Sequence, residues 1–255
     1  MQPQLKILTY NIHKGFSVGN RRFVLDAIRE ALRSSGADLL FLQEAQGEHQ
    51  IHVGRIPGWP LESQFEYLAD KIWPHHAYGR NAVYDHGHHG NAILSRYPFA
   101  GYENINVSSF RRASRSILHG TIRLDETGQE VHVICIHFGL FASERHRQLR
   151  TLCQHIKLKI SVDAPLIVAG DFNDWRGHAS QYLSGQAGLT EVFKHTHGRY
   201  ARSWPAWMPL LTMDRIYYRG LQLDHCERLV HSPWQKLSDH APLMATFNLP
   251  DQAPT

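Results

Sequence analysis

Short runs of apolar residues recur along the whole chain, separated by polar segments that contain glycine, proline, aspartate or asparagine. Continuously apolar runs of this kind, bounded by turn-forming residues, are typical of buried β-strands. The sequence predicts strands at Leu5–Ile12, Asp38–Gln43, Asn91–Ser95, Ile117–Leu124, Val131–Phe138, Leu166–Ala169, Met213–Tyr218 and Pro242–Phe247.

Other segments have the spacing of amphipathic helices. Over Arg21–Ser35 the apolar residues recur every three to four positions, with Asn20 predicted to cap the start and Gly36 to end it. A second such pattern covers Ser143–Ile160, whose first residue is the predicted N-cap, and Tyr67–Trp73 has helical character as well. The strands outnumber the helices and the order is mixed, which favours an α+β fold with central sheets over a repeating parallel wheel.

The chain has no internal repeat, linker or shift in composition, so its 255 residues are expected to form one domain, 1–255. No apolar run approaches the ~20 residues that a membrane-spanning helix needs. The first residues lack a signal-peptide pattern, and on that ground we expect a cytoplasmic protein.

The net charge of +4 is mild and permits a polyanionic partner without requiring one. The three cysteines Cys135, Cys153 and Cys226 are scattered, so reduced, buried thiols are expected rather than a disulfide framework. There are 19 histidines, and each has to be judged on its own.

Polar side chains stand where several predicted strands end. Rigid scaffolds commonly place functional groups at such positions. These residues are Asn11, Glu44, His137, Asp171, Asn173, Asp239 and His240. Carboxylate and amide oxygens suit Mg²⁺ or Mn²⁺, and imidazoles suit proton transfer or the stabilisation of phosphoryl charge. Together these groups point to metal-assisted hydrolysis of a phosphate ester.

The motifs that contain these residues resemble those of the endonuclease/exonuclease/phosphatase superfamily, whose fold DNase I shares. The matching segments run in the family's order and are Leu8–Ile12, Leu42–Glu44, Gly90–Arg96, Ile136–Phe138, Ala169–Asn173, Met213–Ile216 and Leu237–Leu243. The resemblance implies a DNase I-like four-layer α/β sandwich in which two packed β-sheets are flanked by helices. Within the family, Asn-Ile-His-Lys-Gly at 11–15 is most similar to an uncharacterised bacterial subgroup.

The resemblance also implies a role for each matching residue. Metal binding falls to Asn11, Glu44 and Asp239. The catalytic residues it implies are His137, Asp171, Asn173, Asp214 and His240. In this scheme Asp171 orients or deprotonates the attacking water, Asn173 helps to hold the phosphate, and Asp214 holds the other nitrogen of His240, which contacts the scissile phosphate.

Substrate contacts are predicted for Arg115, Asn91, Trp204 and Trp207. Arg115 belongs to a basic group with Arg111 and Arg112 that suits phosphate binding, although a solvated loop is an equal alternative. The loop that holds Trp204, Trp207 and Met208 suits stacking on a base or peripheral contact with lipid, and a small satellite core is the alternative. The histidines at 86, 88 and 89 are expected in a plain turn; substrate contact at the rim of a cleft is the alternative, and a metal site is less favoured than either.

The sequence therefore predicts a divalent-metal-dependent phosphodiesterase that uses Mg²⁺ or Mn²⁺, with nucleic acid as the first choice of substrate. A phospholipid or sphingomyelin-type phosphodiesterase and a phosphatase of small molecules remain alternatives. A non-catalytic binding module is disfavoured, because a degenerate member of the family would be expected to lose some of the residues named above. The oligomeric state stays open.

Overall fold

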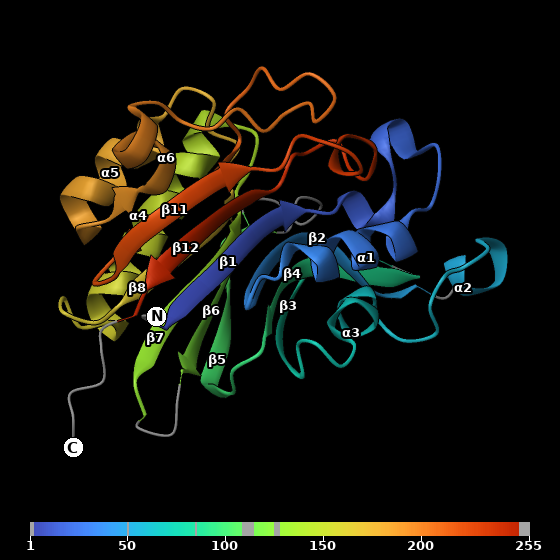
Figure 1. Cartoon of the computed structure of the whole chain (residues 1–255), viewed down its shortest axis with the longest axis horizontal. Coiled ribbons are helices and arrows are strands. Elements are labelled where there is room, and N and C mark those ends of the chain that lie inside the picture. Colours follow the sequence, from blue (N-terminus) through green and yellow to red (C-terminus); the bar gives the residue numbers. More distant parts are fainter. Residues whose placement is uncertain (1–2, 50, 85, 109–114, 125–127, 250–255) are drawn as a thin grey trace.

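The chain folds around two six-stranded β-sheets that pack face to face (Figure 1). The computed structural model describes residues 3–49, 51–84, 86–108, 115–124 and 128–249. The first sheet has the order β11 (Gln222–Arg228), β12 (Leu243–Asn248), β1 (Gln4–Asn11), β2 (Leu39–His49), β4 (Gly87–Ser95) and β3 (His75–Tyr84). The second has the order β5 (Phe99–Asn106), β6 (Ser116–Arg123), β7 (Glu130–His137), β8 (Leu166–Asp171), β10 (Asp214–Arg219) and β9 (Thr190–Glu191).

Strand β1 shows why the central strands are apolar on both faces. Leu5 and Ile7 point into the core between the two sheets, whereas Leu8 and Tyr10 point to the other side, where helices cover the first sheet. Side chains alternate along a strand, so a strand covered on both faces reads as one continuous apolar run. This arrangement explains why the apolar runs in the sequence predicted these strands.

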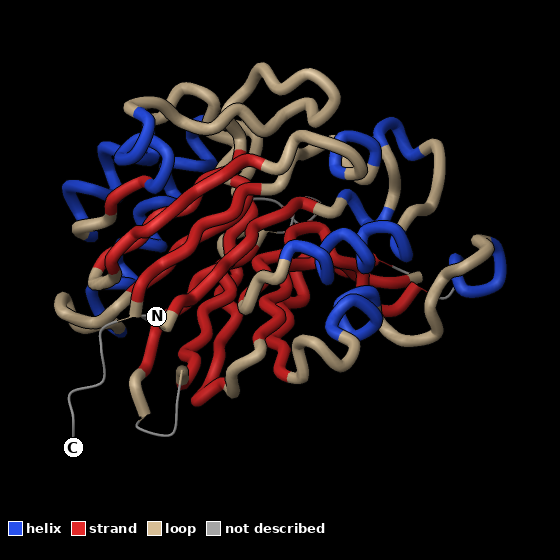
Figure 2. Tube along the Cα trace, in the orientation of Figure 1, coloured by secondary structure: helices blue, strands red, loops and turns tan. Residues whose placement is uncertain are grey.

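Helices cover the outer faces of both sheets, which gives the four layers of a DNase I-like sandwich (Figure 2). Buried side chains of α1 and α3 pack on the first sheet, and those of α4 and α5 pack on the second. The helices are α1 (Leu25–Ser35), α2 (His52–Arg55), α3 (Gln64–Ala69), α4 (Ala142–Lys159), α5 (His178–Ala187) and α6 (Val192–His197), with 3₁₀ turns at His13–Gly15, Val18–Asn20 and Trp234–Lys236. Within the described ranges, no helix has the length and apolar character needed to cross a membrane.

The predicted helix starts were wrong. Helix α1 begins at Leu25 after the N-cap Val24, because Asn20 lies in a separate 3₁₀ turn with a φ of 56°. Helix α4 begins at Ala142, so Ser143 lies inside it and caps nothing. Gly36 does end α1, with a φ of 66°. The spacing of apolar residues located these helices, but the path of the preceding loop determines where each helix begins.

The third predicted helix was shifted. Helix α3 covers Gln64–Ala69, because Ser63 accepts a hydrogen bond from the backbone of Glu66 while the Glu66 carboxylate accepts one from the Ser63 backbone. This capping box starts the helix before Tyr67, and Asp70 ends it with a φ of 43°.

The four edge strands β3, β5, β9 and β11 were missed, and β9 has only two residues. Strands β3, β5 and β11 carry many polar or exposed side chains, so they lack a clear apolar pattern. The predicted histidine-rich turn was also wrong over Gly87–Gly90, which extends β4. The tip residue Asp85 and most of the turn predicted at 125–129 lie outside the described residues.

The three cysteines are buried and unpaired, as predicted. Trp59, Phe65 and Trp73 are buried as well.

Candidate active site

The register of the second sheet brings polar side chains together where three neighbouring strands begin or end. Strands β7 and β8 are parallel and pair His137 with Asp171, while β8 and β10 are antiparallel and pair Asp171 with Asp214. Asp171 therefore stands between His137 and Asp214 on neighbouring strands. Neighbouring strands lie about 4.8 Å apart, so the three side chains share one small region.

The first sheet contributes to the same region. Asn11 ends β1 and donates a hydrogen bond from Nδ2 to Oδ2 of Asp171 over 3.2 Å. His240 precedes β12, and its Nε2 lies 3.9 Å from the same carboxylate oxygen. The backbone at Asn11 is fixed in turn by Ser238, whose hydroxyl donates to the Asn11 carbonyl oxygen over 2.7 Å. The site therefore spans the interface between the sheets.

Asp171 is the centre of this cluster and is 2% exposed. Its Oδ1 accepts a hydrogen bond from the Asn173 backbone over 2.9 Å, and its Oδ2 lies 3.5 Å from Nε2 of His137. Burial raises the pKa of Asp171 to about 7, with a further contribution from the Asp214 charge, and the nearby His240 opposes both. This carboxyl group is therefore poised to exchange a proton near neutral pH.

Asp214 and His240 form a buried pair. Nδ1 of His240 donates to Oδ2 of Asp214 over 2.8 Å, and the Asp214 backbone donates to the Ser203 hydroxyl over 3.1 Å. Burial alone would lower the pKa of His240, but the Asp214 carboxylate outweighs it and raises the pKa to about 10. His240 is therefore a cation at neutral pH, with Nε2 facing Asp171.

His137 behaves in the opposite way. Burial, together with the positive charge of Arg115, holds its pKa well below the ordinary value for histidine. The site thus contains one neutral and one cationic imidazole around a single carboxyl group. Opposite protonation states on neighbouring groups are a frequent arrangement in acid–base sites.

Glu44 occupies an irregular position in β2. The pairing of β2 with β4 shifts between Leu42 and Ala45, and Glu44 has a φ of 57°. Nζ of Lys14 lies 3.5 Å from its Oε2. Burial would raise the pKa of Glu44, but Lys14 and the histidines around it lower the pKa below the ordinary value, so the carboxylate is ionised.

Asp239 has contacts of a similar kind. Nδ1 of His13 lies 3.3 Å from its Oδ1, and the indole nitrogen of Trp204 donates to its Oδ2 over 3.3 Å. His13 and Lys14 are adjacent in the chain, so this one turn contacts both carboxylates, Asp239 and Glu44. Asn11 lies two residues before the turn, and its Oδ1 accepts a hydrogen bond from the His13 backbone.

The donor chemistry of this region fits a hard divalent cation. Asn11, Glu44 and Asp239 offer amide and carboxylate oxygens, which Mg²⁺ and Mn²⁺ prefer. A second group, Asp171, Asp214 and His240, has its ligand atoms within 4.8 Å of one another. The first set offers only oxygen ligands, whereas the second includes an imidazole, so the oxygen set is the better match for Mg²⁺ or Mn²⁺.

No role was predicted for His13 and Lys14, although the segment 11–15 was singled out by its motif. Both residues have positive φ angles, 46° and 55°, and this left-handed turn directs them toward Asp239 and Glu44. A motif shows that two basic residues are present but not which way such a turn aims them.

The other residues that were predicted to act on the substrate or the phosphate make several different contacts. Asn173 has a φ of 49° and donates from Nδ2 to the Phe138 carbonyl oxygen over 2.9 Å. Nε of Arg115 donates to the same oxygen over 3.2 Å. Trp204 binds Asp239, and Trp207 in the same loop is 59% exposed. Arg111 and Arg112 lie outside the described residues.

The histidines of β4 have different neighbours. His88 bonds through Nδ1 to the Tyr78 hydroxyl over 2.9 Å. His89 lies close enough to Glu44 and Lys14 for their charges to act on it, although burial is the main cause that lowers its pKa to about 4. His89 therefore belongs to the surroundings of Glu44, which its predicted place in a turn did not indicate.

Asn91, a predicted substrate contact, is fully buried. Its Nδ2 donates to the carbonyl oxygens of Ser116 and Cys135, at 3.1 and 3.4 Å. Both acceptors belong to the second sheet, so Asn91 ties the sheets together, and a fully buried side chain has no surface with which to touch a substrate. The prediction of a substrate contact was wrong for this reason.

Asn91→Ala is expected to lower the free energy of unfolding by about 1–3 kcal/mol, because two buried carbonyl oxygens lose a donor. Urea unfolding followed by circular dichroism measures this change. Asn104→Ala is the matched control, since Asn104 is exposed on β5 and should change stability by less than about 0.5 kcal/mol. Equal stability of the two variants would contradict the role of Asn91.

Comparison with known proteins agrees with this fold. The two packed sheets flanked by helices make this protein a DNase I-like sandwich, with polar groups at the ends of its strands. The chain belongs to the endonuclease/exonuclease/phosphatase family, whose model matches residues 8–240. It is 46% identical over 248 residues to the protein YbhP of Escherichia coli, covering 97% of this chain and 98% of that one.

Solved structures share the fold at low identity. An endonuclease/exonuclease/phosphatase from Beutenbergia cavernae superposes with a TM-score of 0.78 at 17% identity, covering 98% of this chain and 72% of that one. TDP2 of D. rerio, complexed with a single-strand DNA product, gives a TM-score of 0.70 at 22% identity, covering 96% and 99%.

Proposed function

We propose that this protein is a divalent-metal-dependent phosphodiesterase that hydrolyses nucleic acid. The observation that carries the proposal is the position of Asp171. Its buried carboxyl group lies between the amide of Asn11 and the imidazoles of His137 and His240. Phosphodiesters hydrolyse very slowly without help, and this cluster combines a base, a cation and hydrogen-bond donors at one point.

Asp171 takes the proton of the attacking water. Its pKa of about 7 is close to the pH at which the protein would work, which is the optimum for a general base. The hydrogen bonds from Asn11 and the Asn173 backbone hold the carboxylate in one orientation. The carboxylate can therefore also orient the water before attack.

His240 stabilises the negative charge that develops on the phosphoryl oxygens. Asp214 keeps it cationic and fixes the direction of Nε2. A preorganised cation in a buried site needs little rearrangement during the reaction, which makes its contribution large. The neutral His137 beside Asp171 supplies a further hydrogen-bond donor.

Asn11, Glu44 and Asp239 would hold Mg²⁺ or Mn²⁺. Bound there, the metal would supply neutralisation of phosphate charge. Lys14 and His13 face the carboxylates of Glu44 and Asp239, and their positive charges or hydrogen bonds limit repulsion between these anions.

A nucleic acid substrate is supported by a groove of about 510 Å³ that is lined in part by Arg21, Trp207 and Lys236. An exposed aromatic side chain in the same groove as two cations suits a single strand, because the bases stack and the phosphates pair with the charges. The loop of Trp207 is anchored at the site, since the Ala206 backbone donates to the carbonyl oxygen of Asp239. The structural neighbour TDP2 is itself complexed with a single-strand DNA product.

A lipid-directed phosphodiesterase is the second candidate, favoured by one observation. Trp207, Met208 and Leu210 are all exposed in the same loop, at 59%, 47% and 53%. Apolar side chains in an exposed loop can insert into the headgroup region of a membrane. Cleavage of phospholipid vesicles with no cleavage of DNA or RNA would favour this candidate.

Trp207→Ala is expected to raise KM for single-stranded DNA by about 5- to 150-fold, which corresponds to the 1–3 kcal/mol of one stacked base. Cleavage of bis(p-nitrophenyl) phosphate should be unchanged, because this small diester has no base to stack and no proposed catalytic residue lines the groove. Trp175→Ala is the matched control, as Trp175 is also exposed but does not line the groove. An unchanged KM for DNA would remove Trp207 from the binding surface.

The proposed function is tested by hydrolysis of bis(p-nitrophenyl) phosphate against p-nitrophenyl phosphate, with Mg²⁺ or Mn²⁺ and with EDTA, in the wild type and His240→Ala. We expect cleavage of the diester that requires both the metal and His240. Cleavage of the monoester alone would make the protein a phosphatase instead. Cleavage that survives EDTA and His240→Ala alike would refute the proposed mechanism.

A further inference from the structure

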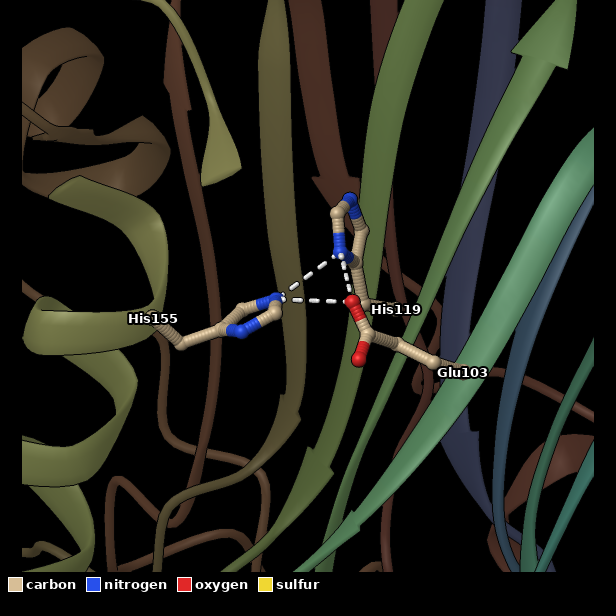
Figure 3. A group of neighbouring side chains, drawn as sticks. All are labelled: Glu103, His119 and His155. Atoms are coloured by element: carbon tan, nitrogen blue, oxygen red, sulfur yellow. Dashed lines mark hydrogen bonds and ion pairs between the residues drawn. The ribbon is translucent and has the colours of Figure 1, made fainter. Parts of the chain in front are cut away.

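A second cluster of ligand-type side chains lies on the outer face of the second sheet, under α4. It consists of Glu103 from β5, His119 from β6 and His155 from α4, and their side chains point toward one another (Figure 3). His119 and His155 are buried, at 6% and 9%, whereas the Glu103 side chain is 47% exposed. None of the three belongs to the site described above.

The distances within this cluster match a metal site. Nδ1 of His119 and Nε2 of His155 share a hydrogen bond of 2.9 Å, which a bound ion would replace, and Oε1 of Glu103 lies 3.7 Å from the first nitrogen and 3.8 Å from the second. The point equidistant from three atoms with these separations lies about 2.0 Å from each, which is the length of a bond from zinc to nitrogen or oxygen. The carboxylate is too far from either nitrogen for a hydrogen bond, yet it faces both.

The other nitrogen of His119 also has a suitable partner. Its Nε2 lies 3.0 Å from Nδ1 of His132 on β7, and the Thr121 hydroxyl lies 3.2 Å from that same Nδ1. Histidines that bind a metal usually donate their second ring nitrogen to a neighbour, which fixes the tautomer. Burial lowers the pKa of His119 to about 3, so its imidazole is neutral and has a lone pair to donate.

We infer that Glu103, His119 and His155 bind one Zn²⁺ ion, with the fourth position open to solvent beside Glu103. Two imidazoles and one carboxylate form a common zinc ligand set, and imidazole ligands favour zinc over Mg²⁺. The ion would fasten the second half of α4 to the edge strand β5. Near the start of α4, Arg145 donates to the carbonyl oxygen of Gly139, which follows β7 of the proposed catalytic site. His155 lies ten residues further along the same helix, a distance of about 15 Å. The site is therefore separate from the proposed catalytic one.

The test is the zinc content of the full-length protein after incubation with ZnSO₄ and gel filtration, together with competition against a chromogenic chelator. The wild type should retain one equivalent that His155→Ala and Glu103→Gln lose. Loss of a direct ligand should weaken binding by more than the roughly 10- to 100-fold that an outer-shell partner is worth. Glu103 is exposed, so Glu103→Gln should fold even if a buried histidine cannot be replaced.

Two controls separate this site from others. His146→Ala removes an exposed histidine from the same helix and should keep the zinc. Glu44→Gln removes only zinc that is held at the proposed catalytic site. The inference is overturned if the wild type retains no zinc that Glu44→Gln spares, or if His155→Ala and Glu103→Gln retain as much as His146→Ala. None of these readouts depends on catalytic activity.

Discussion

Asp171→Asn is expected to lower kcat for bis(p-nitrophenyl) phosphate by about 10²- to 10⁴-fold, the usual contribution of a positioned general base. Asparagine has nearly the same shape and can still accept a hydrogen bond from Asn11 or from the Asn173 backbone. It cannot accept a proton from water. The loss should therefore appear in kcat, while the variant keeps a cooperative thermal unfolding transition.

Asp163→Asn is the matched control for this experiment, because Asp163 is an exposed carboxylate that precedes β8, whereas Asp171 lies at the other end of that strand. It should leave kcat unchanged. If Asp171→Asn retained more than a tenth of the wild-type kcat, a different group would have to accept the proton. The proposal would then lose the observation on which it rests.

A double-mutant cycle between Asp214 and His240 is expected to show strong non-additivity. His240→Gln should lower kcat by about 10²- to 10³-fold, as the loss of a preorganised charge does in other enzymes. Asp214→Asn should lower kcat by a smaller factor, because His240 stays in place but loses the carboxylate that keeps it charged and oriented. The double variant should be no worse than His240→Gln alone, since Asp214 acts through His240.

The contrary result is equally clear. If the two factors multiplied in the double variant, Asp214 would act directly on the substrate or on a metal, as its place in a group with Asp171 would permit. Asp214→Glu gives a further check. If the Asp214 carboxylate only orients His240 and keeps it charged, Asp214→Glu should retain part of the activity that Asp214→Asn loses.

The central strands and the arrangement of the site were predictable because both depend on local patterns. Leu5–Ile12 is apolar on both faces, so it had to be a covered strand, and Asn11 had to stand where that strand ends. Asp171 was found in the same way, because it follows the predicted strand Leu166–Ala169, whereas Asp214 was predicted only from the resemblance to the family. The prediction of a substrate contact failed for Asn91, because its side chain reaches across the core to the second sheet.

Features that depend on distant contacts were not predictable. Strand β5 is mostly exposed, so nothing in its sequence marked it as a strand or placed Glu103 opposite His119. His155 meets His119 only because α4 packs across the sheet. Likewise, the positive φ angles of His13 and Lys14 decide their contacts with Asp239 and Glu44, and such angles follow from the folded chain.

The hydrogen bond from Asn11 to Asp171 joins two strands that belong to different sheets. The separation between the proposed catalytic groups of the two sheets is therefore set by the thickness of the hydrophobic interior. Residues such as Phe41 and Leu118 fill that interior. A displacement of about 1 Å at a reacting group can cost a hundredfold in rate. Substitutions deep in the interior, far from any substrate, are thus a route by which evolution or laboratory selection can retune this protein while every active-site residue stays the same.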